Sequence, residues 1–128
     1  MALDRHSTQF CGDLTNPEGI VETVGQWRPS VIINAAAYTA VDKAESEPDT
    51  ARQINADAPT ALAQVASETG AWLVHYSTDF VFDGSSTHPW RENDATGPLN
   101  IYGRSKLDGE QGVTTEGTKF LIFRTSWV

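Results

Sequence analysis

The sequence is short of cysteine and of long apolar runs, and each shortage removes a class of protein. Cys11 is the single cysteine among 128 residues, which rules out an internal disulfide and fits a reducing compartment. No apolar run approaches the ~20 residues that a membrane-spanning helix needs. The N-terminus also lacks the charged and apolar regions of a signal peptide. We therefore expect a cytoplasmic protein without a membrane partner.

Basic residues are also few. Nine Lys and Arg face seventeen Asp and Glu, which gives a formal net charge of −8. Duplex DNA needs a basic face to neutralise its phosphates, so the balance predicts no nucleic-acid partner. It leaves room for a small anionic ligand held by backbone N–H groups and one or two cations. No spacing of His, Cys and carboxylates is typical of a metal site, and we predict none.

What is present is typical of one globular domain over residues 1–128. Hydrophobic residues make up 39% and charged residues 20% of the chain, as in folded soluble domains. Short apolar runs alternate with longer helical stretches, which predicts an α/β fold with a parallel sheet and crossover helices. The expected strands are 31–37, 71–77 and 120–124, the first of them covered on both faces. The expected helices are 17–27, 42–69 with a break at Pro48, and 102–112, and 79–99 is a long loop of the kind that is usually functional.

Tyr102 and Lys106 form the central feature of the sequence. Residues four apart lie on one face of a helix, so a phenol and an ammonium are expected side by side. The positive charge favours the phenolate form and makes the tyrosine a better proton donor or acceptor near neutral pH. Alone, the pair is a weak signal, because a solvated lysine beside a tyrosine is common on helices.

Two predicted strands end in small or polar residues, which strengthens the signal. Ser77, Thr78 and Asp79 follow one strand, and residues 34–39 end the other. In open parallel sheets ligands bind beyond the carboxyl ends of the strands, and a hydroxyl there can donate to a carbonyl oxygen as charge develops on it. A strand-end hydroxyl, a tyrosine and a lysine thus converge on one edge of the sheet, which favours a catalytic role.

Four blocks of sequence carry a resemblance to a known family. They are 34–45 (NAAAYTAVDKAE), 76–82 (YSTDFVF), 98–106 (PLNIYGRSK) and 124–128 (RTSWV). Together they closely resemble the dTDP-4-dehydrorhamnose reductases, which belong to the extended short-chain dehydrogenase/reductase superfamily. The similarity covers essentially the whole chain, in order, and implies a Rossmann-like fold.

The resemblance implies a reaction. The family reduces the 4-keto group of dTDP-6-deoxy-L-lyxo-4-hexulose with NADH or NADPH, giving dTDP-L-rhamnose for bacterial surface polysaccharide such as O-antigen. By this resemblance Tyr102 is the proton donor to the sugar carbonyl oxygen and Lys106 holds the nicotinamide ribose hydroxyls. Thr78 hydrogen-bonds the same carbonyl oxygen, and Asp79 and Trp127 lie against the sugar nucleotide.

The resemblance also implies a cofactor-binding set. Besides Tyr102 and Lys106, its members are Asp4, Asp13, Leu14, Ala37, Tyr38, Thr39 and Tyr76. Asp4 fits the acidic residue at the end of a second strand that binds the adenine ribose. Arg5 beside it could accept a 2′-phosphate, so NADH and NADPH both stay open.

The chain departs from the family pattern at both ends. It contains no glycine-rich turn of the kind that meets a pyrophosphate at a helix N-terminus, and residues 2–4 resemble the tail of a strand. We expect a fragment that lacks the first βα unit and the C-terminal substrate region, with impaired activity by itself. Without the first strand, the strand at 31–35 would have an unpaired edge, which predicts a homo-oligomer or strand-exchanged dimer.

Two alternative functions stay open. A sugar-nucleotide epimerase or dehydratase uses the same hydroxyl, tyrosine and lysine, although here Asp79 rather than Glu follows Thr78. A non-catalytic, reductase-like regulatory subunit would keep the fold without turnover, and the intact Thr78, Tyr102 and Lys106 favour the enzyme.

Four further features have structural interpretations. His75 is interpreted as a packed side chain rather than an acid–base group. The charged residues within 42–47 are interpreted as a solvated helix face. Trp72 and Trp90 are expected to be core and loop-packing residues.

Overall fold

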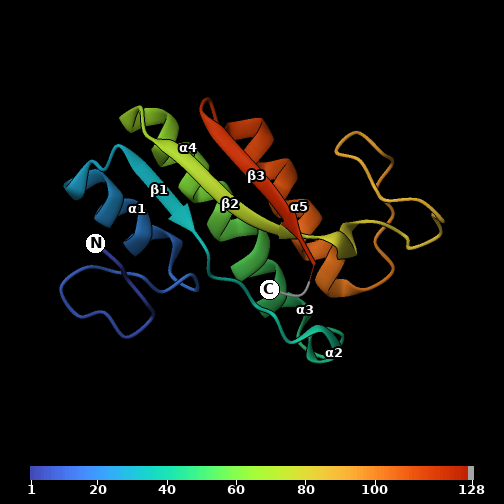
Figure 1. Ribbon diagram of the computed structural model, residues 1–128. Helices are drawn as coiled ribbons and strands as arrows, with labels where there is room; N and C mark the ends of the chain where they lie inside the picture. Colours follow the sequence, from blue (N-terminus) through green and yellow to red (C-terminus); the bar gives the residue numbers. More distant parts are fainter. Residues whose placement is uncertain (127–128) are drawn as a thin grey trace.

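The computed structural model describes residues 1–126, which form a three-stranded parallel sheet with helices on one face (Figure 1). The strands are β1 (Val31–Asn34), β2 (Trp72–Thr78) and β3 (Phe120–Thr125), in the order β1-β2-β3. Both neighbouring pairs run parallel, and parallel strands need a crossover connection, usually helical. This arrangement confirms the predicted α/β class.

Several of the helices begin or end at a local sequence signal. They are α1 (Pro17–Trp27), α2 (Val41–Ala44), α3 (Pro48–Arg52), α4 (Ala58–Thr69) and α5 (Ile101–Glu116), with a π-helical turn η1 (Gln53–Asp57) and a 3₁₀ turn η2 (Asp79–Val81). Asn16 Oδ1 accepts from the Gly19 N–H at 3.0 Å and caps α1, and Gly70 ends α4 with φ 75°, both common terminal signals. The predicted break at Pro48 is confirmed, because α3 begins there. No helix in residues 1–126 is long and apolar enough to cross a bilayer.

The hydrophobic core lies between the sheet and the helices behind it. Leu73 of β2 is fully buried, and Ile20 of α1, Leu62 of α4 and Val113 of α5 pack into the same cluster. Leu73 projects from one face of the sheet, and the three helix side chains pack against that same face. The core therefore fixes α1, α4 and α5 against a single sheet face.

The opposite face of the sheet is open, which corrects two expectations. Val31 is 50% exposed, Ile33 65% and Trp72 46%, and the register places Val31 beside Trp72. The first strand is thus not covered on both faces within residues 1–126, and Trp72 is not a core residue. A continuous apolar run shows that both faces of a strand are apolar, but not that both are covered.

The N-terminal segment and the end of β1 also differ from expectation. Residues 2–4 are not strand: Asp4 instead forms a turn in which its carbonyl accepts from the Ser7 N–H at 3.1 Å. A strand needs a neighbour with which to exchange hydrogen bonds, and these residues pair with none of the three strands. β1 stops at Asn34 rather than at residue 37, because its pairing with β2 ends there, with Asn34 opposite His75.

Candidate functional site

Helix α5 sets the position of Tyr102. Asn100 Oδ1 accepts from the Gly103 N–H at 2.7 Å and caps the helix. Gly103 lies against the Phe80 carbonyl so closely that a β-carbon there would collide with it. The Tyr102 ring packs edge-on against the Phe80 ring with centroids 5.6 Å apart. The half-buried Tyr102 therefore lies just beyond the carboxyl end of β2, because Phe80 is only two residues after Thr78, the last residue of that strand.

Lys106 approaches the same strand from one turn further along α5. Its side chain is buried, and its Nζ donates to the backbone carbonyl of Tyr76 at 2.5 Å. Burial lowers the pKa of Lys106 to about 8, while the Glu110 carboxylate acts in the opposite direction. The Tyr76 ring points to the open face and packs near Phe123, with centroids 5.8 Å apart. Tyr76 thus meets Lys106 through its backbone.

Thr78 and Asp79 form a small polar cluster at the end of β2. The buried Thr78 hydroxyl accepts from the Phe80 N–H at 3.3 Å and donates to Asp79 Oδ1 at 3.2 Å. Asp79 Oδ2 accepts from the Ser126 hydroxyl at 2.6 Å. Asp79 lines a hollow of about 600 Å³ beside β3. Trp127, the other predicted sugar contact, lies outside the described residues.

The loop with Ala37, Tyr38 and Thr39 is tied to helix α5 through Asn55. Asn55 Oδ1 accepts from the Tyr38 N–H at 2.9 Å, and its Nδ2 donates to the Tyr38 carbonyl at 3.0 Å. The same Nδ2 donates to Ser105 Oγ at 3.0 Å. Asn55 is 1% exposed, where unsatisfied amide groups would be costly. The structure thus joins the predicted cofactor loop to α5.

The remaining residues of the predicted cofactor set lie in the N-terminal segment. Asp13 Oδ1 accepts from the Thr15 N–H at 2.9 Å, and the Thr15 carbonyl accepts from Gln53 Nε2 at 3.0 Å, which links this turn to η1. Asp4 is exposed, and within residues 1–126 its carboxylate bonds only to His6 and Ser7. Within residues 1–126 no hydrogen bond joins Asp4 to another member of the predicted set, although its backbone lies against Gly12, next to Asp13.

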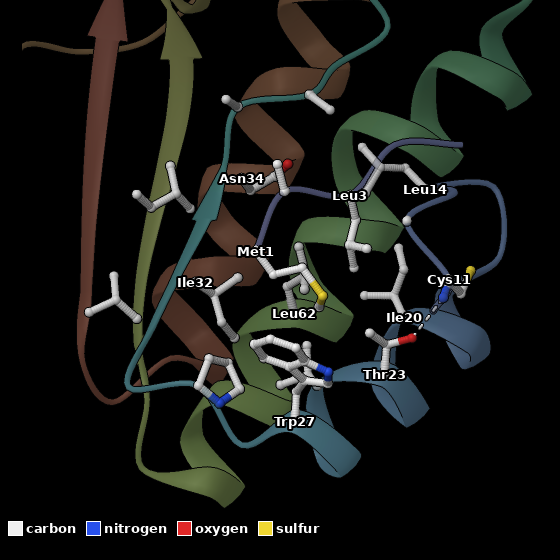
Figure 2. Close-up of a pocket in the computed structure, with 18 residues that line it drawn as sticks. Met1, Leu3, Cys11, Leu14, Ile20, Thr23, Trp27, Ile32, Asn34 and Leu62 are labelled. Carbon is white, nitrogen blue, oxygen red and sulfur yellow. Dashed lines mark hydrogen bonds between the residues drawn. The ribbon is translucent and has the colours of Figure 1, made fainter. Parts of the chain in front are cut away.

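A second hollow, of about 650 Å³, lies beside the free edge of β1 (Figure 2). Figure 2 shows Met1, Leu3 and Leu14 of the N-terminal segment lying across from Ile32 of β1. Among the described residues of the predicted set, only Leu14 lines it. This hollow is therefore separate from the cluster at the end of β2.

Two interpretations of individual residues are confirmed. His75 is fully buried, and its Nδ1 lies 3.2 Å from Asn34 Nδ2. Burial and the nearby charge of Lys106 lower the pKa of His75 to about 3. Trp90 packs in the loop by stacking on Phe82, with centroids 4.5 Å apart.

The charged segment 42–47 is only partly a solvated helix face. Lys43 and Glu47 form the expected pair, at 2.8 Å. Glu45 instead accepts the Ile101 N–H at 2.8 Å. The sequence analysis did not identify the contacts that Glu45 and Asn55 make with α5. An asparagine inside a long predicted helix is unusual and could have indicated a structural role for Asn55. No local feature distinguishes Glu45 from the other charged residues of this segment.

The gathered residues define a class of protein. A parallel sheet with a strand-end hydroxyl, a helix tyrosine and a buried lysine at one edge is a Rossmann-like fold of the short-chain dehydrogenase/reductase type. A family model described as "RmlD substrate binding domain" matches residues 1–128. The chain belongs to that family.

Individual relatives agree with this membership. A dTDP-4-dehydrorhamnose reductase of Salmonella typhimurium is 60% identical over 128 residues, all of this chain and 43% of the relative. That of Escherichia coli K12 is 59% identical with the same coverage. The chain thus spans less than half the length of the curated relatives that it matches.

Solved structures carry the same fold. A dTDP-4-dehydrorhamnose reductase of Clostridium acetobutylicum superposes with a TM-score of 0.88 at 43% identity, over 91% of this chain and 41% of that one. The Bacillus anthracis enzyme, solved in complex with NADP, gives 0.86 at 44% identity, over 90% and 41%. A Brucella ovis UDP-glucose 4-epimerase in complex with NAD gives 0.77 at 24% identity, over 89% and 37%, a likeness of fold alone.

Proposed function

We propose that this chain carries the catalytic residues of an NAD(P)H-dependent reductase acting on the 4-keto group of dTDP-6-deoxy-L-lyxo-4-hexulose, giving dTDP-L-rhamnose. The observation that carries the proposal is the gathering of three side chains around the end of β2. Lys106 bonds to Tyr76, Tyr102 packs on Phe80, and Thr78 lies between these two positions on the chain. The identity to named dTDP-4-dehydrorhamnose reductases supports the choice of substrate.

The residues present fit a nicotinamide cofactor. A lysine ammonium has three N–H donors, and within residues 1–126 Lys106 uses one of them, on the Tyr76 carbonyl. The other two are available to the ribose hydroxyls. The loop at Ala37–Thr39 would lie along the cofactor, with Asp13, Leu14 and Asp4 toward its adenine end. The NADP complex of the Bacillus anthracis relative supports NADPH, and NADH is the other candidate.

Each catalytic side chain has one task in this scheme. The cofactor, when bound, supplies the hydride. Tyr102 gives its phenolic proton to the sugar oxygen as negative charge develops there. The Thr78 hydroxyl donates a second hydrogen bond to that oxygen, leaving its present bond to Asp79. Lys106, one turn after Tyr102 on α5, would hold the nicotinamide ribose hydroxyls.

A chimeric enzyme tests the proposal. Residues 1–128 would replace the matching 43% of the Salmonella typhimurium relative, and oxidation of NADH and NADPH would be followed by absorbance with the dTDP-4-keto-6-deoxy sugar. We expect turnover by the chimera and a fall of about 100-fold or more in kcat for Tyr102→Phe, since a general acid typically contributes that much. Ser86→Ala, in the exposed part of the 79–99 loop, is the matched control and should leave kcat unchanged.

The other outcomes separate the alternatives. An inactive chimera would contradict the reductase and favour the epimerase or the non-catalytic subunit. Turnover that survives Tyr102→Phe would contradict the assigned proton donor. We expect no turnover by the 128 residues alone, because they contain no glycine-rich turn to hold a pyrophosphate.

We also propose a cytoplasmic location and self-association. One cysteine and nucleotide ligands suit a reducing cytoplasm. Within residues 1–126 β1 pairs with β2 on one side only, and its Ile33 is 65% exposed. Open apolar strand edges invite pairing with another chain. Sedimentation of the 128-residue chain should show a dimer or larger species that Ile33→Lys shifts toward monomer; a compact wild-type monomer would contradict this.

A further inference from the structure

Glu45 makes a contact that no neighbour in sequence explains. It follows helix α2, and its Oε1 accepts the backbone N–H of Ile101 at 2.8 Å across 56 residues of chain. Ile101 is the first residue of α5, and Tyr102 is the second. An acidic side chain from a separate segment therefore binds the first turn of the catalytic helix.

The first turn of α5 needs such an acceptor. The first N–H groups of an α-helix have no partner within the helix. Asn100 satisfies the N–H of Gly103, and Glu45 satisfies that of Ile101. A carboxylate there also interacts favourably with the positive end of the helix dipole and forms a charge-assisted hydrogen bond. Glu45 thus supplies a cap that the local sequence does not provide.

The segment that carries Glu45 is itself fixed at both ends. At its C-terminal end, Asn55 forms hydrogen bonds with the Tyr38 backbone and with Ser105 of α5. Before it, the Tyr38 hydroxyl donates to Glu47 Oε2 at 2.8 Å, and Glu47 pairs with Lys43. The segment from residue 38 to residue 55 is therefore hydrogen-bonded to α5 at Ile101 and at Ser105, and Tyr102 lies between these two residues.

We propose that Glu45 is a positioning residue for Tyr102. It holds the start of α5 against the 38–55 segment, so that the phenol stays beside Phe80 and the end of β2. Glu45 acts through the helix backbone and touches neither the substrate nor the cofactor. This inference rests on the proposed function for the role of Tyr102, although the contact itself does not.

Kinetics of the chimeric enzyme test the catalytic part. Glu45→Ala should lower kcat about fivefold, as expected for loss of one helix-terminal hydrogen bond, with KM for NADPH within about twofold. Glu45→Gln keeps an oxygen acceptor and should restore most of kcat. Asp42→Asn removes the same charge from an exposed side chain of α2 and should change neither constant. An unchanged kcat in Glu45→Ala, or an equal loss in Asp42→Asn, would overturn the proposal.

Nuclear magnetic resonance tests positioning without turnover. In Glu45→Ala the Ile101 amide should exchange about fivefold faster, and the cross-peak between the Phe80 and Tyr102 rings should weaken. Both signals should be retained in Asp42→Asn. Unchanged exchange and ring contact in Glu45→Ala would overturn the proposal even in an active enzyme. A chimera without turnover that shows these losses would contradict the proposed function and leave the positioning role supported.

Discussion

Acidification from pH 7 to pH 5 should destabilise the fold mainly through His75. The side chain is fully buried on the helix-facing side of β2 and lies near the Lys106 ammonium. Both effects disfavour the imidazolium and lower the pKa of His75 from its ordinary 6.5 to about 3. The unfolded chain, in contrast, takes up a proton near pH 6.5.

The sign and size of the effect follow from this difference. A group with a lowered folded pKa contributes its full stability above the unfolded pKa and loses it as pH falls toward the folded one. Between pH 7 and pH 5 the unfolded state becomes almost fully protonated at this site while the folded state stays neutral. The free energy of unfolding should fall by about 2 kcal/mol over this range. Because pH 5 lies well above the folded-state pKa of about 3, protonation of the unfolded state accounts for nearly all of this loss of stability.

Urea unfolding at the two pH values, followed by tryptophan fluorescence, measures this loss. His75→Gln keeps a donor and an acceptor but cannot titrate, so its free energy of unfolding should change by less than about 0.5 kcal/mol between pH 7 and pH 5. His88→Gln, at an exposed position, should behave like the wild type. If His75→Gln lost as much stability as the wild type, other groups would be responsible and the account of His75 would be wrong.

Three further predictions concern α5 and its contacts, the first with a comparison on α1. Gly109→Ala should destabilise the fold by about 3 kcal/mol, because a β-carbon there would meet the η1 backbone. Gly25→Ala, with open space around it, should stabilise the fold by about 0.5–1 kcal/mol. Thermal unfolding of the two variants measures both effects. The pKa of Lys106 is lowered to about 8, so between pH 8 and pH 10 the unfolded state holds a proton that the folded state has released. The free energy of unfolding should therefore rise by about 2 kcal/mol over that range, relative to Lys106→Met. Urea unfolding at the two pH values measures the rise. Arg124 donates from Nη2 and Nε to the two carboxylate oxygens of Glu110, at 2.6 and 2.9 Å, and the Glu110 side chain is only 7% exposed. Arg124→Met should lower the free energy of unfolding by about 3 kcal/mol, because it leaves a buried carboxylate unpaired. A loss below about 1 kcal/mol in chemical denaturation would contradict this.

Much of the fold follows from local signals in the sequence. Asn16 and Pro17 start α1, Gly70 ends α4 and Pro48 starts α3, because caps and proline act within a few residues. The place of Tyr102 and Lys106 on one helix follows from their spacing of four. The continuous apolar runs predict strands, and the structure has them close to the expected positions.

Other expectations failed because they depended on neighbours that the local pattern does not specify. Residues 2–4 have suitable strand residues but, in the part of the chain that the structure describes, no strand pairs with them. Trp72 has core character but lies on the open face. An apolar residue becomes buried only when another element covers it. Covering is a property of the packed arrangement of α1, α4 and α5, which all lie on one side of the sheet (Figure 1).

By itself, the sequence determined the types and order of the helices and strands and the set of side chains capable of the proposed chemistry. The tertiary structure alone decided that Lys106 bonds to Tyr76, that Glu45 caps α5 and that Asn55 joins Tyr38 to Ser105. These contacts join residues between 17 and 56 positions apart, and hydrogen bonds of this kind depend on distance and direction after folding. The lowered pKa values of Lys106 and His75 arise in the same way, because burial and neighbouring charge exist only once the chain has packed.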